Sequence, residues 1–220
     1  LEAKATEGEI SQLRSVVGSL AWIAPQCRPG LSYHCSKLQS IAPSAQLKHL
    51  KEANKILQTA IAGAGDGCYY KAKAFNWNDA VIGTITDASW AGEKAVVEDR
   101  VFPRKSQMGR VTIIADPKLW DGESCYFHVI GWKSTLIHRT CRSTMHAESQ
   151  SQIGGVGLGI KLRTAIAEAR GLRDDDRRAE SCAHAIKHVW LTDCESLNSY
   201  LINPVAAPVE DKRLEIDLLD

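Results

Sequence analysis

The spacing of apolar residues changes character once along this chain of 220 residues, at the glycine-rich run 63–67. Before this run, apolar residues recur at steps of three and four, which places them on one face of a helix. After it, they gather in short runs rich in β-branched and aromatic residues, as is typical of strands. The sequence therefore predicts a helical region over residues 1–66 and a separate α/β domain over residues 67–220.

Three helices are expected in the first region. The first begins near Ile10 and ends before Pro25, and the second spans Leu31–Ile41. A third is expected to start at Ser44, whose hydroxyl suits a helix N-cap, and to stop at Gly63.

The second region predicts an α/β layered fold with a mixed sheet and the element order βββαβα. The first three strands are expected to form an antiparallel meander. A glycine-rich stretch, 154–159, lies in the long helix, where each glycine costs about 1 kcal/mol relative to alanine and marks either close packing or a break. The expected strands are Val81–Thr86, Arg110–Ala115, Ser124–Trp132 and Ile186–Thr192, and the expected helices are Ser143–Ala169 and Cys194–Ile202.

Charge and cysteine content exclude several classes of protein. Lysine plus arginine (27) nearly balances aspartate plus glutamate (26), so a nucleic-acid surface has to be local. The stretch Lys133–Arg142 contains no acid and is either such a surface or a solvated loop. Seven cysteines without a Cys-x-x-Cys pair are neither a disulfide framework nor a zinc ladder, which favours a reducing, intracellular compartment.

Three acidic residues fall at predicted junctions of the α/β domain. Asp87 follows the first strand, Glu148 lies in the first turns of the long helix, and Asp193 follows the fourth strand. Strand ends are where α/β folds gather their functional groups. Carboxylates that meet there repel one another unless a cation compensates them, and Mg²⁺ prefers such oxygen ligands. We therefore expect a site for two Mg²⁺ ions, roughly 3.5–4 Å apart, with Mn²⁺ as a substitute.

Short motifs around these acids follow one another in a fixed order. They are Thr86-Asp87-Ala88-Ser89-Trp90-Ala91-Gly92, Lys105-Ser106-Gln107-Met108-Gly109, Gly131-Trp132-Lys133-Ser134, Ser143-Thr144-Met145-His146-Ala147-Glu148-Ser149, Leu191-Thr192-Asp193-Cys194-Glu195-Ser196 and Asn203-Pro204. The ordered set resembles the ribonuclease H domain of copia-type retrotransposon Pol polyproteins. The stretches Leu13–Leu20 and Arg28–Tyr33 resemble the region after the polymerase palm in the same polyproteins, so residues 1–66 correspond to the end of the reverse transcriptase, its thumb or connection.

The resemblance implies a ribonuclease H-like fold and an endonuclease that cleaves the RNA strand of RNA–DNA hybrids during reverse transcription. It implies that Asp87, Glu148 and Asp193 are catalytic metal ligands. The fourth ligand is Asp217, which keeps the family's residue type, or Glu215, which keeps its spacing from a lysine; Asp217 is preferred. The expected partners are the hybrid and an upstream reverse transcriptase palm, with no membrane.

Several further residues are candidates for substrate binding or for the core. Lys133, Ser134, Arg142 and His146 are candidates for substrate binding, although His146 is also expected to be an exposed helical histidine. His128 and Trp90 are expected in the core.

Both chain ends are expected to continue in a longer polyprotein, with the ribonuclease H-like domain truncated at its C-terminus. The expected location is the cytoplasm, inside retrotransposon particles or outside them, or the nucleus, and not the exterior of the cell. Two alternatives stay open: a catalytically degenerate scaffold or nucleic-acid-binding module of the same fold, and an integrase-like enzyme that acts on DNA alone.

Overall fold

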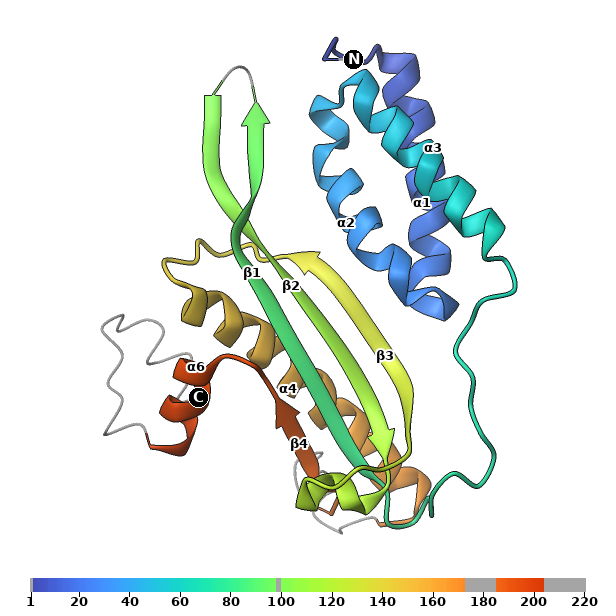
Figure 1. The fold of residues 1–220 in the computed structure, drawn as a ribbon, viewed down its shortest axis with the longest axis vertical. Helices are drawn as coiled ribbons and strands as arrows, with labels where there is room; N and C mark the ends of the chain where they lie inside the picture. The colour runs from blue at the N-terminus through green and yellow to red at the C-terminus, as the bar shows by residue number, and fades with distance from the viewer. Residues whose placement is uncertain (1, 98–99, 173–184, 204–220) are drawn as a thin grey trace. The chain divides into compact units, whose positions relative to one another are not determined.

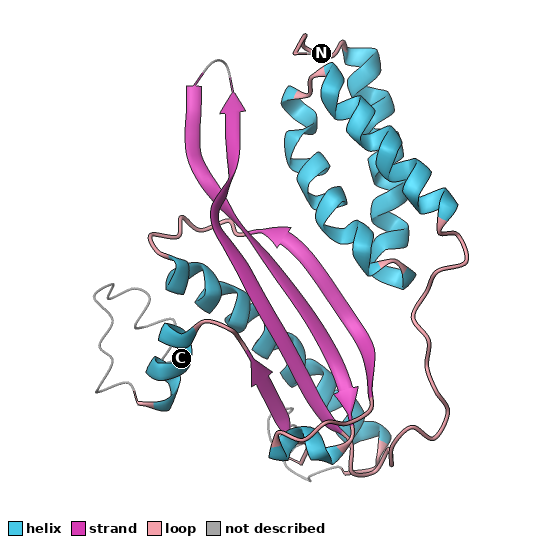
Figure 2. Ribbon diagram, in the orientation of Figure 1, coloured by secondary structure: helices cyan, strands magenta, loops and turns pink. Residues whose placement is uncertain are grey.

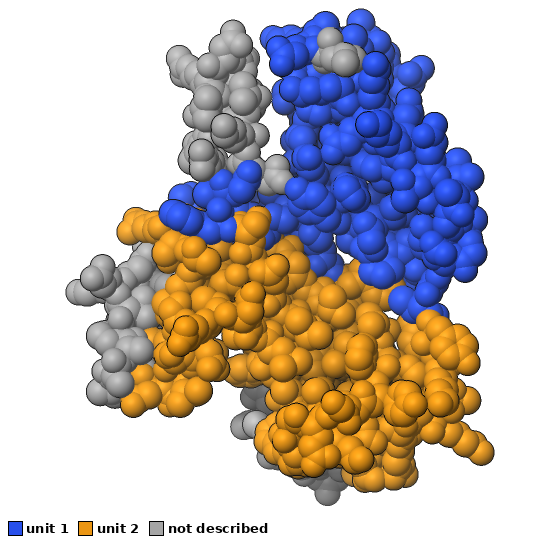
Figure 3. Space-filling model, in the orientation of Figure 1, with its two compact units in different colours: residues 1–68, 90–107, 133–140 blue, residues 69–89, 108–132, 141–220 orange. Residues whose placement is uncertain are grey.

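A computed structural model describes residues 2–97, 100–172 and 185–203. The chain forms two compact units (Figure 3). Unit 1 comprises Leu1–Cys68, Trp90–Gln107 and Lys133–Thr140, and unit 2 comprises Tyr69–Ser89, Met108–Trp132 and Cys141–Asp220. Each unit therefore consists of three segments that are separate in the sequence.

Unit 1 contains the three predicted helices, α1 (Glu7–Cys27), α2 (Ser32–Ile41) and α3 (Leu47–Ala62). Their apolar faces bury a core that includes Leu13, Val17, Leu20, Leu38 and Ile56. This agrees with the three- and four-residue spacing, because that period brings apolar side chains to one face.

Two helix boundaries differ from the prediction. Helix α1 continues through Pro25 and ends two residues later, at Cys27. Pro25 has no backbone N–H, so the helix loses a single hydrogen bond at this residue. Ser44 lies in a 3-10 turn (Ala42–Ser44), and Gln46 is the N-cap of α3. The predicted stop at Gly63 is confirmed, since this residue is the C-cap.

A mixed sheet of four strands lies at the centre of the described α/β part (Figures 1 and 2). Its strands are β1 (Val81–Val97), β2 (Arg100–Ala115), β3 (Phe127–Leu136) and β4 (His188–Leu191), in the order β3-β2-β1-β4. Strand β2 runs antiparallel to both of its neighbours, β1 and β3, whereas β4 is parallel to β1 (Figure 1). The predicted α/β class and mixed sheet are confirmed.

Strands β1 and β2 are much longer than expected, because they continue past Thr86 and start before Arg110 as the two arms of a hairpin. Their additional residues include charged side chains and two glycines, Gly92 and Gly109, which apolar alternation does not mark. Backbone pairing between two neighbouring arms does not require apolar side chains. This is why the strand ends were predicted wrongly.

Helix α4 (Thr144–Ala169) packs closely against the part of the sheet in unit 2. A Cβ atom added at Gly155 would lie 2.6 Å from Thr84 Cγ2 and 2.9 Å from Thr86 Cγ2, and one at Gly159 would overlap the ring of His188. The glycines therefore mark close packing of an unbroken helix. A short helix, α6 (Glu195–Ile202), follows β4.

Candidate metal centre

Three acidic side chains from three elements of unit 2 converge. Asp87 lies in β1, Glu148 in the second turn of α4, and Asp193 two residues beyond β4. One carboxylate oxygen from each lies within 4.8 Å of the others. We call Asp87, Glu148 and Asp193 the acidic triad.

The parallel pairing of β1 with β4 explains why the two aspartates meet. Ile85 is paired with Leu191 in the register, and each aspartate lies two residues beyond its paired residue. Residues at the same distance beyond a paired position lie side by side when the two strands are parallel. Asp87 and Asp193 therefore lie at the same level of the sheet. One expectation was wrong: Asp87 lies inside β1, since β1 continues into its hairpin with β2 after β4 has ended.

Glu148 is the buried member of the triad, with only 3% of its surface exposed. Its Oε1 accepts a hydrogen bond of 3.0 Å from the backbone N–H of Ala88. Its Oε2 is also buried, and no hydrogen-bond donor reaches it among the described residues. A buried carboxylate oxygen without a partner is destabilising, and a bound cation would compensate it.

The pKa of Glu148 reflects this environment. The pKa is raised to about 7: burial is the largest cause, the hydrogen bond from Ala88 opposes it, and the nearby carboxylates of Asp87 and Asp193 add to it. Asp87 and Glu148 can share a hydrogen bond only when one of the two carboxyl groups is protonated. Without a cation, Glu148 therefore holds its proton to a higher pH than an ordinary glutamate does.

The structure brings together three of the four acids predicted as ligands. Asp217, preferred as the fourth ligand, and its alternative Glu215 lie outside the described residues.

The four candidates for substrate binding are divided between the units. Lys133, which is exposed, and Ser134 belong to unit 1, whereas Arg142 and His146 belong to unit 2, as the triad does. Ser134 Oγ accepts a hydrogen bond of 2.8 Å from Gln107 Nε2.

Three expectations about burial were wrong. His146 is only 7% exposed, because its position in the first turn of α4 faces the interior, so it is not an exposed helical histidine. Trp90 is 47% exposed and lies outside the core. His128 is half-buried between the rings of Tyr70 and Phe75, and its Nε2 lies 3.2 Å from the carbonyl oxygen of Lys71.

Sequence reasoning missed a buried polar residue beside the triad. Gln152 lies four residues after Glu148, on the same face of α4, and is 3% exposed. The available signal was a glutamine at the i+4 position from a proposed ligand, because residues four apart lie on the same face of a helix.

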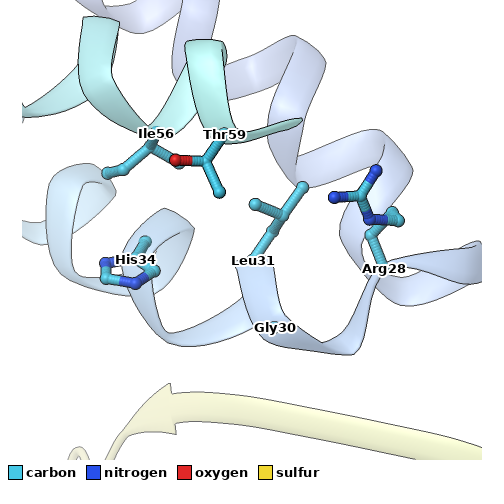
Figure 4. A pocket seen from close by; sticks show the side chains of 6 residues that line it. All are labelled: Arg28, Gly30, Leu31, His34, Ile56 and Thr59. Carbon is cyan, nitrogen blue, oxygen red and sulfur yellow. The ribbon is translucent and has the colours of Figure 1, made fainter. Parts of the chain in front are cut away.

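Unit 1 contains a separate pocket of about 160 Å³ between its helices (Figure 4). Arg28 is among the residues that line it, but its guanidinium donates hydrogen bonds to the carbonyl oxygens of Ala60 and Gly63. The lining contains no carboxylate. The full lining is Arg28, Gly30, Leu31, His34, Ile56 and Thr59.

Comparison with protein-family models, with curated proteins and with solved structures found no match. In the described part of the chain, none of the helices has both the length and the apolar character needed to cross a membrane. The site itself defines the class at the level the geometry supports: an α/β unit with an acidic triad that could hold a metal ion.

Proposed function

We propose that unit 2 is a metal-dependent endonuclease with a ribonuclease H-like fold, which cleaves the RNA strand of RNA–DNA hybrids during retrotransposon reverse transcription. The observation that carries the proposal is the convergence of Asp87, Glu148 and Asp193 within 4.8 Å. Each acid comes from a different motif of the ordered set described above. Among the described residues, the strands and helices of the α/β part follow the order βββαβα that the sequence pattern predicts.

The chemistry of the donor set supports Mg²⁺. All three groups are carboxylates, hard oxygen ligands that suit Mg²⁺ or Mn²⁺ better than zinc or copper. Oε2 of Glu148, which no donor in the described part of the chain reaches, is a buried atom that a cation would compensate. In the proposed enzyme, Asp217 supplies the fourth carboxylate.

Bound divalent ions would activate a water molecule and stabilise the leaving oxygen of the phosphodiester. The residues of the chain prepare the site for them. Ala88 holds Oε1 of Glu148 through its N–H, and Glu148 has to lose its proton before it can act as a ligand. Strand selection would come from contacts to the RNA 2′-hydroxyl.

The alternative of a degenerate scaffold has two motivations, the glycine-rich stretch of α4 and the choice of fourth ligand between Asp217 and Glu215, which lie outside the described residues. The helix is continuous over the glycine-rich stretch, and Gly155 and Gly159 lie where α4 approaches β1 and β4. These glycines therefore no longer favour a degenerate site, and the scaffold becomes an outcome of the activity test.

The test is cleavage of a labelled RNA–DNA hybrid in Mg²⁺ by the wild type, Asp87→Asn and Glu148→Gln. We expect each variant to lose at least about 100-fold in rate, because loss of a direct ligand exceeds the 10–100-fold effect of outer-shell partners. Glu123→Gln removes an exposed acid of the same unit and should leave the rate unchanged.

Wild-type rates in both triad variants, after removal of contaminating nucleases, would exclude the proposal. Metal binding without cleavage of any substrate would favour the scaffold. Action on duplex DNA alone would favour the integrase-like alternative.

A further inference from the structure

The contact between α4 and β1 contains a buried polar pair next to the acidic triad. Thr86 Oγ1 donates a hydrogen bond of 2.5 Å to Gln152 Oε1. Both residues are buried, at 2% and 3% exposure. Thr86 directly precedes the ligand Asp87, and Gln152 lies one helical turn after the ligand Glu148. The pair therefore joins the two elements that supply two of the three carboxylates.

The packing of α4 on β1 includes a contact to which the helix contributes no side chain. The contact is made by Gly155, which approaches the methyl groups of Thr84 and Thr86 without a side chain of its own. A glycine allows close approach but presents no side chain to interlock with the strand. Directional hydrogen bonds are a further means of setting the register between helix and strand.

A second hydrogen bond acts at the same place. Ser151 Oγ lies 3.1 Å from the backbone carbonyl oxygen of Asp87 and 3.1 Å from that of Gly109, and it can donate to either. Together with the N–H of Ala88 on Glu148 Oε1, these contacts tie the first turns of α4 to the segment of β1 that carries the ligand.

The identity of residue 152 is not explained by stability. Gln152 Nε2 is buried without a hydrogen-bond partner among the described residues. An unsatisfied buried polar group is destabilising, so an apolar side chain of similar volume would serve packing better. A role in the geometry of the site accounts for a glutamine that packing does not favour.

We infer that Thr86 and Gln152 are positioning residues for the metal centre: their hydrogen bond fixes the register of α4 on β1 and holds Glu148 against Ala88, beside Asp87. This inference rests on the proposed metal centre. Metal ligands need to be held within about 0.5 Å of their working positions, and outer-shell hydrogen bonds are what hold them.

Two isosteric variants break the pair, Thr86→Val and Gln152→Met, and Thr86→Ser keeps the hydroxyl. The matched control is Thr112→Val. Thr112 is a fully buried threonine of β2 in the same unit, and no partner reaches its Oγ1 among the described residues. Circular dichroism and thermal melting establish that each variant is folded, and Gln152→Met alone carries the test if Thr86→Val unfolds.

Two readouts are needed, one with metal and one without. Titration with Mn²⁺, followed by electron paramagnetic resonance, should show affinity reduced about 10–100-fold in Thr86→Val and Gln152→Met. Thr86→Ser should stay close to the wild type, and Thr112→Val should equal it. In metal-free protein, the amide of Ala88 should exchange with solvent faster in the two isosteric variants, since its bond to Glu148 is loosened.

The inference is overturned if both isosteric variants keep wild-type Mn²⁺ affinity and wild-type protection of the Ala88 amide. Failure of the wild type itself to bind Mn²⁺ would instead overturn the metal centre. In that case, the exchange of the Ala88 amide still decides whether the pair positions Glu148.

Discussion

Glu148 is the residue whose chemistry most depends on what occupies the acidic triad. Burial among carboxylates raises its pKa to about 7 from the ordinary value of 4.5. The folded, metal-free protein therefore binds this proton more tightly than the unfolded chain does. The stabilisation is fully present below pH 4.5 and is lost as the pH rises through about 7.

The first prediction at this scale concerns pH. In a chelator, the free energy of unfolding of the wild type should fall between about pH 5 and 8, relative to that of Glu148→Gln, by up to about 3 kcal/mol. Urea denaturation of both proteins at several pH values measures the difference. A difference that does not change with pH would show that Glu148 is not protonated in the fold.

The limits of sequence reasoning are clear at the same scale. Asp87, Glu148 and Asp193 were predicted because each stands in a recognisable short motif. Thr86 and Gln152 were missed, since a hydrogen bond between residues 66 positions apart leaves no local pattern. His146 and Trp90 were placed wrongly, because the side of an element that faces the core depends on its packing partners.

At the level of elements, helix α4 depends on glycine where it approaches the sheet. A methyl group at Gly155 would meet Thr84 Cγ2 at 2.6 Å, whereas Gly157, on the same helix, has nothing within 4 Å of its added Cβ. Substitution at the first position should force α4 away from β1. Substitution at the second should only increase helix propensity.

The second prediction compares these two glycines. Gly155→Ala should lower the free energy of unfolding by about 1–3 kcal/mol through overpacking. Gly157→Ala should raise it by up to about 1 kcal/mol. Equilibrium denaturation measures both changes, and equal effects at the two positions would contradict the close packing of α4 on β1.

Elements differed in how well the sequence predicted them. Helices α1, α2 and α3 were found because amphipathic spacing and terminal signals are local properties of the chain. The starts of β1 and β4 were nearly right, but the hairpin extension of β1 and β2 was missed. Its two arms are held by backbone pairing with each other, which the side-chain pattern of either arm does not reveal.

Across the whole molecule, the described part of the candidate site lies within unit 2. Its three acids come from β1, the start of α4 and the segment after β4, so the site exists only when these elements are assembled. A ligand that binds only the assembled site stabilises the folded protein against the unfolded chain.

The third prediction follows from that linkage. Mg²⁺ at about 100 times its dissociation constant should stabilise the wild type by about 2.7 kcal/mol. Asp87→Asn and Glu148→Gln should show no such gain, while Glu123→Gln should respond as the wild type does. Thermal melting with and without Mg²⁺ measures the effect, and an equal gain in the triad variants would locate the ion elsewhere.

A crystal structure of the protein soaked in Mn²⁺, with the ion located by its anomalous scattering, tests the metal centre most directly. We predict Mn²⁺ between the carboxylates of Asp87, Glu148 and Asp193, with Oε2 of Glu148 among its ligands. Carboxylates found on separate surfaces, or a triad empty at saturating Mn²⁺, would contradict the metal centre and the nuclease proposed from it.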